Sequence, residues 1–144
     1  MRFTAPLLVL VLCSSVSIRA PRAQQVSVTA PAPFCGPIGV AQTRTTLYLG
    51  LNRRTGSVTE AQWAAFLRDE VTPRFPQGLT VWQADGQWRR ADGTIAQERS
   101  KVLLLVHDES SAAHSALTAI IESYKHRFEQ ESVLWETARV CAAF

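Results

Sequence analysis

The order of strand-like and helix-like segments constrains the fold of this chain more than any other feature of its sequence. Residues 45–52 alternate leucines with polar or small residues, which is the period of a strand with one buried face. Thr59 and Gln62 then form the capping box that marks the start of a helix, and Pro73 ends that helix. The folded part of the chain is therefore predicted to begin with a strand followed by a helix.

The same order returns in the second half of the chain. In sequence order, the predicted elements are a strand over 78–89, a hairpin turn at Asp92-Gly93, a strand over 98–108, a helix from Ser110 or Ser111, and a strand over 132–143. We expect Asp85-Gly86 to interrupt the first of these strands. The chain is therefore expected to read strand, helix, strand, strand, helix, strand.

This order predicts the α+β class and, within it, the ferredoxin-like split βαβ fold (βαββαβ). One four-stranded antiparallel sheet would carry two helices on one face, with the first and third strands at its centre. Leu47, Leu49 and Leu51 are expected to face the helices.

The other face of the predicted sheet is more informative about function. We expect the face under the helices to include Val102, Leu104 and Val106, and the opposite face to include Leu103, Leu105, His107, Tyr48 and either Trp82 or Val81. Such an apolar face is seldom left bare, so the N-terminal arm, a second subunit or a ligand is expected to cover it. Two such faces packed together would give a homodimer with the form of a dimeric α+β barrel.

The N-terminal 23 residues have the pattern of a secretory signal peptide. Arg2 precedes the apolar run Leu7–Leu12, and small residues follow. The run is too short for a permanent membrane span, so we expect no transmembrane helix in the mature form. We predict export to the periplasm or the cell exterior. The alternative is a lipid anchor at Cys13, but Leu12 is larger than the residue that precedes a lipidated cysteine.

Removal of this leader changes the charge balance. Residues 1–23 hold three arginines and no acidic residue, so 12 basic and 12 acidic side chains remain. A near-neutral mature chain argues against nucleic-acid binding. Residues 24–43 are rich in Pro and Ala and are expected to form a flexible arm, and residues 44–144 a single α+β domain.

Two cysteines, Cys35 and Cys141, remain near the ends of the mature chain. In an oxidising compartment such a pair is expected to form a disulfide, and the alternative is two buried thiols. The sequence has no CxxC motif, no HExxH motif and no His/Cys cluster. It therefore predicts neither a metal site nor a cofactor.

Several short motifs resemble one family. They are Thr72-Pro73-Arg74-Phe75-Pro76, Gly86-Gln87-Trp88, Glu98 with Ser100-Lys101-Val102, and the stretch from Tyr124 through Phe128 to Gln130-Glu131-Ser132-Val133. In this order they resemble DUF3574, a family of small exported bacterial proteins of uncharacterised function. The resemblance covers about residues 44–142. It implies export and a single small domain, and it provides no catalytic residues to transfer.

The segment around Arg74 has two interpretations. Two prolines stiffen it, and Phe75 is expected to fill the gap between helix and sheet. Arg74 either pairs with a carboxylate such as Glu98 in a rigid corner, or presents its guanidinium to an anionic ligand.

Two further groups of residues are candidates for a site. His107 follows the apolar strand and precedes Asp108, so it is a weak candidate for a general base oriented by that carboxylate. The second group contains aromatic rings beside one basic and one acidic side chain: Tyr48, Trp82, Trp88, Arg89 and Glu98. Such a group suits a small polar or cyclic molecule, although the tryptophans also serve core and hairpin packing.

Three classes of function follow from these observations. The first is a small binding or interaction domain of the periplasm or cell exterior, with a small-molecule or protein ligand. The second is a small enzyme with its site on the open sheet face of a dimeric barrel. The third, by analogy of fold alone, is an inhibitor or chaperone-like partner of an exported protease.

Overall fold

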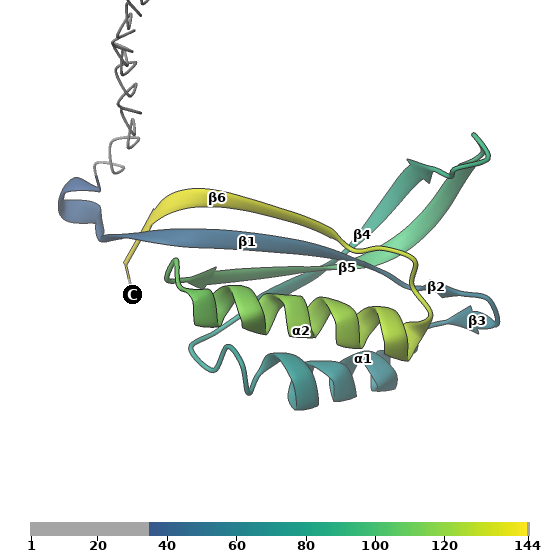
Figure 1. Cartoon of the computed structure of the whole chain (residues 1–144), viewed down its shortest axis with the longest axis horizontal. Helices are drawn as coiled ribbons and strands as arrows, with labels where there is room; N and C mark the ends of the chain where they lie inside the picture. Colours follow the sequence, from purple (N-terminus) through teal and green to yellow (C-terminus); the bar gives the residue numbers. More distant parts are fainter. Residues whose placement is uncertain (1–34, 144) are drawn as a thin grey trace, which may run out of the picture. The chain divides into compact units, whose positions relative to one another are not determined.

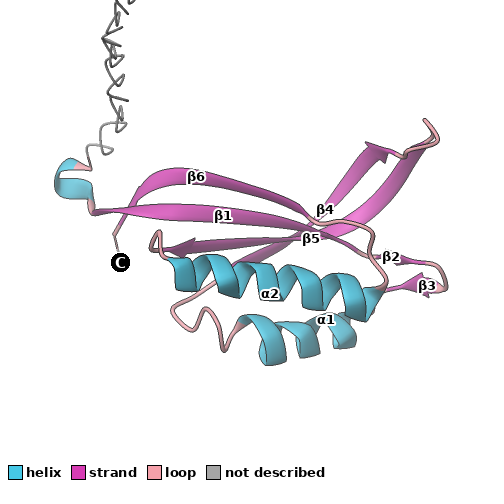
Figure 2. Ribbon diagram, viewed as in Figure 1, coloured by secondary structure: helices cyan, strands magenta, loops and turns pink. Residues whose placement is uncertain are grey.

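The computed structural model describes residues 35–143. The predicted signal peptide at 1–23, the lipidation site at Cys13 and most of the predicted arm lie outside these residues. Figures 1 and 2 show one antiparallel sheet with both main helices on the same face. The elements are η1 (Gly36–Ile38), β1 (Val40–Gly50), β2 (Asn52–Arg53), β3 (Gly56–Ser57), α1 (Glu60–Phe66), η2 (Leu67–Val71), β4 (Thr80–Arg89), β5 (Ile95–His107), α2 (Ser111–Phe128) and β6 (Leu134–Ala142).

The four long strands lie in the order β4-β5-β1-β6, and every neighbouring pair is antiparallel. The chain thus has the predicted α+β architecture, with the first and third long strands at the centre of the sheet. β1 starts at Val40, earlier than the pattern of 45–52 indicates. Residues 36–43 therefore contain η1 and the first part of β1, although the sequence assigned them to the predicted arm.

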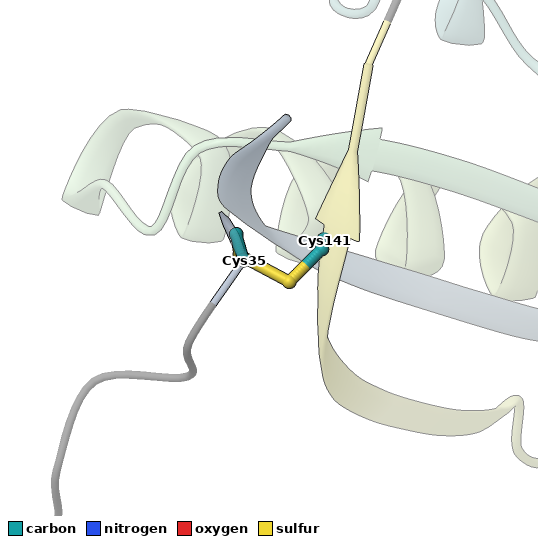
Figure 3. The surroundings of a disulfide bond; sticks show 2 residues. All are labelled: Cys35 and Cys141. Carbon is teal, nitrogen blue, oxygen red and sulfur yellow. A yellow bond between two sulfur atoms is a disulfide. The ribbon is translucent and has the colours of Figure 1, made fainter. Parts of the chain in front are cut away.

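A disulfide joins Cys35 to Cys141, as predicted (Figure 3). The two Cα atoms are 5.2 Å apart, and 106 positions separate the residues in sequence. Cys141 lies in β6, the edge strand beside β1. The bond therefore joins the segment before β1 to the last strand.

Both ends of α1 follow the local signals in the sequence. The Thr59 hydroxyl accepts a hydrogen bond from the Gln62 N–H, and the Gln62 side chain accepts one from the Thr59 N–H, which completes the predicted capping box. The helix widens in its last turn, η2, where the Thr72 N–H donates to the Leu67 carbonyl at 2.8 Å. Helical structure ends before Pro73, as expected.

The core lies between the helices and the sheet. α2 starts after Ser110, whose hydroxyl accepts from the Ala113 N–H at 3.1 Å. Its buried face packs on α1 and on the central strands. The side chains in this core are aliphatic or aromatic: Leu47, Leu49, Leu103, Leu105, Phe66, Leu117, Ile120, Tyr124 and Phe128. Phe75 is also part of this core, as predicted.

The face assignment of β5 corrects one expectation. Leu47 pairs with Leu103, and Thr45 with Leu105, and directly paired residues share a face. Because Leu47 faces the helices, so do Leu103 and Leu105, both fully buried. The expected assignment of these residues to the far face was wrong by one position. Residues 102–106 are all apolar, so period-two patterning could not fix the register.

The far side of the sheet, which we call the open face, nevertheless remains partly apolar. Val102, Leu104 and Val106 lie there instead, together with Tyr48 and Trp82. Trp82 is 44% exposed, whereas Val102 is covered by its neighbours and only 1% exposed.

β4 and β5 form a long hairpin whose far end extends away from the helices (Figure 1). β4 runs through Asp85-Gly86 without the interruption predicted there. Because Gly86 keeps the negative φ of a strand, it continues the ladder opposite Glu98. The predicted turn at Asp92-Gly93 does connect the strands, with the Gly93 N–H donating to the Arg90 carbonyl.

No helix among the described residues is long and apolar enough to cross a bilayer.

Candidate functional site

A hollow of about 270 Å³ lies on the open face, toward the hairpin end of the sheet. We call it the open-face hollow. The residues that line it are Tyr48, Gly50, Gly86, Gln87, Trp88, Glu98, Ser100, Gln130, Glu131, Ser132 and Leu134. It thus brings together residues from four strands and from the loop between α2 and β6.

Small residues on neighbouring strands form the floor of the hollow. Gly50 of β1 pairs with Ser100 of β5, and Gly86 of β4 pairs with Glu98 of β5. Side chains of directly paired residues project from the same face, so three small residues here leave the backbone uncovered. The depression therefore results from the sequence at these positions.

Larger side chains surround this floor. Tyr48 and Leu134 are paired across β1 and β6, and Trp88 lies on β4 two residues beyond Gly86. Trp88 is 41% exposed and Leu134 is 61% exposed. The open-face hollow therefore offers aromatic and apolar surface directly to solvent.

Glu98 and Gln130 are held beside the floor by the backbone of Asn52. The Asn52 N–H donates to Glu98 Oε1 at 3.0 Å, and Gln130 Nε2 donates to the Asn52 carbonyl at 2.6 Å. Gln130 Nε2 also donates to the Phe128 carbonyl at 3.1 Å. The arrangement depends on Gly50, where a Cβ would lie 2.5 Å from Glu98 Oε1 and 2.8 Å from Gln130 Oε1.

The electrostatic character of the hollow is acidic. Its lining includes Glu98 and Glu131 and contains no lysine or arginine. The Tyr48 hydroxyl donates to Glu136 Oε1 at 3.3 Å. Burial raises the pKa of Tyr48 most, and the charge of Glu136 raises it further, whereas Arg44 lowers this pKa to a smaller extent. The charge of Glu136 thus affects the pKa of Tyr48 more than the charge of Arg44 does.

The structure brings together only part of the aromatic group predicted from sequence. Tyr48, Trp88 and Glu98 all line the open-face hollow. Trp82 lies on the same face but does not line the hollow. Arg89 lies near the turn of the hairpin, where its Nη1 donates to the Gly93 carbonyl at 3.3 Å.

Arg74 lies elsewhere and does not pair with Glu98. Its Nη1 donates to the Glu70 carbonyl at 2.7 Å and to Glu70 Oε2 at 3.0 Å. These contacts fix the arginine to the end of its own helix, one turn back. Arg74 also lines a separate hollow of about 490 Å³, together with Phe75, His107 and the start of α2.

His107 lies on the helix face of the sheet and not on the open face. Its Nδ1 is 2.7 Å from the Asp108 backbone carbonyl, an acceptor, so Nδ1 carries the proton. Nε2 lies 2.9 Å from the Thr45 hydroxyl, which is fully buried. The ring is therefore oriented by a carbonyl and not by the Asp108 carboxylate, which accepts from Ser110.

Eight residues that line the open-face hollow were not recognised as site residues from sequence: Gly50, Gly86, Gln87, Ser100, Gln130, Glu131, Ser132 and Leu134. Gly50 and Leu134 read as ordinary strand positions. The other six belong to motifs of the family resemblance, but no chemistry was attached to them. Among residues 35–143, no group of three or more His, Cys, Asp or Glu side chains is placed to hold a metal ion.

Comparison with known proteins identifies a family and a fold. The family model described as "Protein of unknown function (DUF3574)" matches residues 44–144. No curated protein matched the sequence. A phage SAM lyase in complex with S-methyl-5'-thioadenosine is similar in structure, with a TM-score of 0.54 and 16% identity over 76% of this chain and 97% of that chain. A phage SAM lyase in its apo state gives a TM-score of 0.49 at 16% identity, over 72% and 92% of the two chains. At this identity the likeness establishes a shared fold alone.

Proposed function

The chain belongs to the DUF3574 family, and we propose that it is a small binding domain that takes an organic ligand in the open-face hollow. One observation carries the proposal. Three of the residues predicted to bind a ligand, Tyr48, Trp88 and Glu98, line a single depression with a floor of small residues. Ligand sites are concave and mostly apolar, with a few oriented polar groups.

The lining suggests which parts of a ligand would be recognised. The rings of Tyr48 and Trp88 suit a flat or methylated group, and fixed oxygens and amides suit polar atoms. Glu98 and Gln130 are held by backbone hydrogen bonds before any ligand arrives. Such preorganisation lowers the entropic cost of binding.

We also propose that the domain works outside the cytoplasm. The N-terminal pattern of residues 1–23 and the Cys35–Cys141 disulfide support this location. Mass spectrometry of the protein recovered from the periplasm or medium tests it, because removal of a leader shortens the chain. An uncleaved chain in which Cys35 and Cys141 are both free thiols would contradict this part of the proposal. The order of elements further supports the split βαβ arrangement inferred from sequence.

A ligand screen with an occluded variant tests the binding proposal. We would measure thermal stabilisation by neutral, anionic and cationic metabolites, and S-methyl-5'-thioadenosine is one member of this panel because a protein of the same fold binds it. Gly86→Leu should fill the hollow without strain, since a Cβ at this position would have only the Glu98 backbone oxygen, 3.8 Å away, within 4 Å.

The control for this screen lies on the same strand and face. Thr80→Leu places the same side chain on β4, opposite Leu104 and outside the hollow. We expect ligands that stabilise the unmodified protein and the Thr80→Leu variant to lose their effect on Gly86→Leu. Ligands that stabilise all three proteins equally would place binding elsewhere and contradict the proposal.

An enzyme with its site near His107 is the second candidate. The observation that favours it is the hydrogen-bonded series from the Thr45 hydroxyl to His107 and on to the Asp108 carbonyl, beside a hollow of about 370 Å³. This site would lie on the helix face, in contrast to the open-face enzyme expected from sequence. Turnover of a ligand from the screen that is lost in His107→Ala and kept in Gly86→Leu would select this candidate.

A further inference from the structure

We propose that the ligand of the open-face hollow carries a methylated ammonium group. This inference rests on the binding function proposed above and names the chemical class of the ligand. Three features of the hollow support it: its excess of carboxylates, a carboxylate oxygen of Glu98 that accepts no hydrogen bond from residues 35–143, and the aromatic rings beside its floor.

The first feature is the sign of the charge. Glu98 and Glu131 line the hollow, Glu136 bonds the Tyr48 hydroxyl, and no basic side chain is part of the lining. Arg44 lies on the same face, but its effect at Tyr48 is smaller than that of Glu136. An anionic ligand would meet like charges here, and a cationic ligand would meet opposite ones.

The second feature is the orientation of Glu98. The Asn52 N–H occupies Oε1, and no group within residues 35–143 donates to Oε2. Most of Glu98 is covered by its neighbours, with Gly50 beneath its carboxylate. Its carboxylate is therefore fixed in place while one oxygen stays open to a positive partner.

The third feature is independent of the carboxylates. Tyr48 and Trp88 line the same hollow from different strands. The face of an aromatic ring attracts a cation, and among Trp, Tyr and Phe the Trp ring attracts it most strongly. Methylated ammonium groups suit such rings because they carry positive charge without strong hydration, which makes them the better fit over a metal ion or a primary amine.

The experiment compares two molecules of the same shape and different charge. Choline carries a trimethylammonium group, and 3,3-dimethyl-1-butanol replaces its nitrogen with carbon. We expect calorimetric titration of the full mature chain to show choline binding that is at least ~10-fold tighter than binding of the neutral alcohol. Added salt should weaken choline binding, since part of the attraction is between charges at the surface.

Matched variants assign the effect to named groups. Glu98→Gln keeps the shape and the acceptor for the Asn52 N–H, and it should weaken choline by ~10-fold without changing the alcohol. Glu109→Gln is the control, because this exposed carboxylate pairs with Arg139 away from the hollow. Trp88→Leu should weaken choline ~3-fold or more through loss of the aromatic face.

The outcomes separate this inference from the binding function on which it rests. Equal affinity for choline and the alcohol, with both lost in Gly86→Leu, would overturn the charge preference and leave the binding function standing. Choline binding that persists in Gly86→Leu would reflect general surface attraction and overturn the inference. No binding of choline at millimolar concentration would also overturn it, while the wider ligand panel still tests the function.

Discussion

At the scale of single residues, Gly50 makes the proposed site possible. A Cβ at this position would come within 2.5 Å of Glu98 Oε1 and 2.8 Å of Gln130 Oε1. Both groups are held over this spot by hydrogen bonds to Asn52. The absence of a side chain at Gly50 therefore allows an acidic and an amide group to lie directly on the sheet.

We predict that Gly50→Ala destabilises the fold by about 1–3 kcal/mol, because Glu98 or Gln130 must move and lose its hydrogen bond to Asn52. Urea denaturation followed by circular dichroism measures the change. Gly86→Ala is the control, since its Cβ would meet only a backbone oxygen at 3.8 Å. Equal stability of Gly50→Ala and the unmodified protein would show that the crowding at this position is not real.

Tyr124 predicts a pH dependence. Its hydroxyl donates to the Gly50 carbonyl at 2.7 Å inside the core. Burial, and to a smaller extent the charge of Glu98, raises its pKa well above the ordinary value of 10.0. Above about pH 10 the unfolded chain loses this proton first, so the free energy of unfolding should fall as the pH rises toward the folded pKa.

Tyr124→Phe separates the two contributions of this hydroxyl. At neutral pH we expect a loss of about 1–2 kcal/mol, because the buried Gly50 carbonyl loses its donor. Above pH 10 the variant should show less of the alkaline decline than the unmodified protein. Tyr48→Phe, which removes an exposed hydroxyl, should change neutral stability by less than about 0.5 kcal/mol. Parallel alkaline curves for Tyr124→Phe and the unmodified protein would refute the assignment.

At the scale of elements, the disulfide carries the clearest prediction. Cys35 and Cys141 close a loop with a separation of 106 positions. In the chain-entropy model, opening such a loop costs about 4–5 kcal/mol. We expect the Cys35→Ala, Cys141→Ala double variant to show this loss of stability in chemical denaturation. A reducing agent should lower the stability of the unmodified protein and leave that of the double variant unchanged. A reducing agent without effect on the unmodified protein would mean that the bond does not form.

The elements also show how far the sequence could predict this structure. Both helix starts were predictable, because Thr59, Gln62 and Ser110 act on backbone groups three residues away. The register of β5 was not, because five consecutive apolar residues satisfy either face equally well. The order of strands and helices along the chain, and with it the α+β class, could be predicted from the periodicity of apolar residues in each segment.

The candidate site was predictable only in part, for a related reason. Aromatic and acidic residue types mark Tyr48, Trp88 and Glu98 as candidates in the sequence itself. The floor of Gly50, Gly86 and Ser100 becomes visible only when three strands are placed in register. Arg74 and Arg89 have suitable chemistry, but local contacts hold them at other places in the fold.

At the scale of the whole molecule, the open face still allows a second copy to bind. Trp82 is 44% exposed on this face, beside the covered Val102 and outside the hollow. We expect the protein to associate at high concentration through this face and Trp82→Glu to return it to a monomer, because the charge would lose its hydration in the interface. Light scattering measures both states, and a monomeric unmodified protein would remove the homodimer predicted from sequence.

The measurement that tests the account most directly is a titration of the isotopically labelled protein with choline, followed by the backbone and indole N–H signals in NMR. Each of the four tryptophans carries one indole N–H: Trp63 lies in α1, Trp82 and Trp88 lie on β4, and Trp135 lies on β6. We predict progressive shifts of the Trp88 indole and of the Gly50 and Gly86 amides, with the Trp63 and Trp135 indoles unchanged. Shifts centred on Trp135 and His107, or no shift at Trp88, would contradict a ligand site in the open-face hollow.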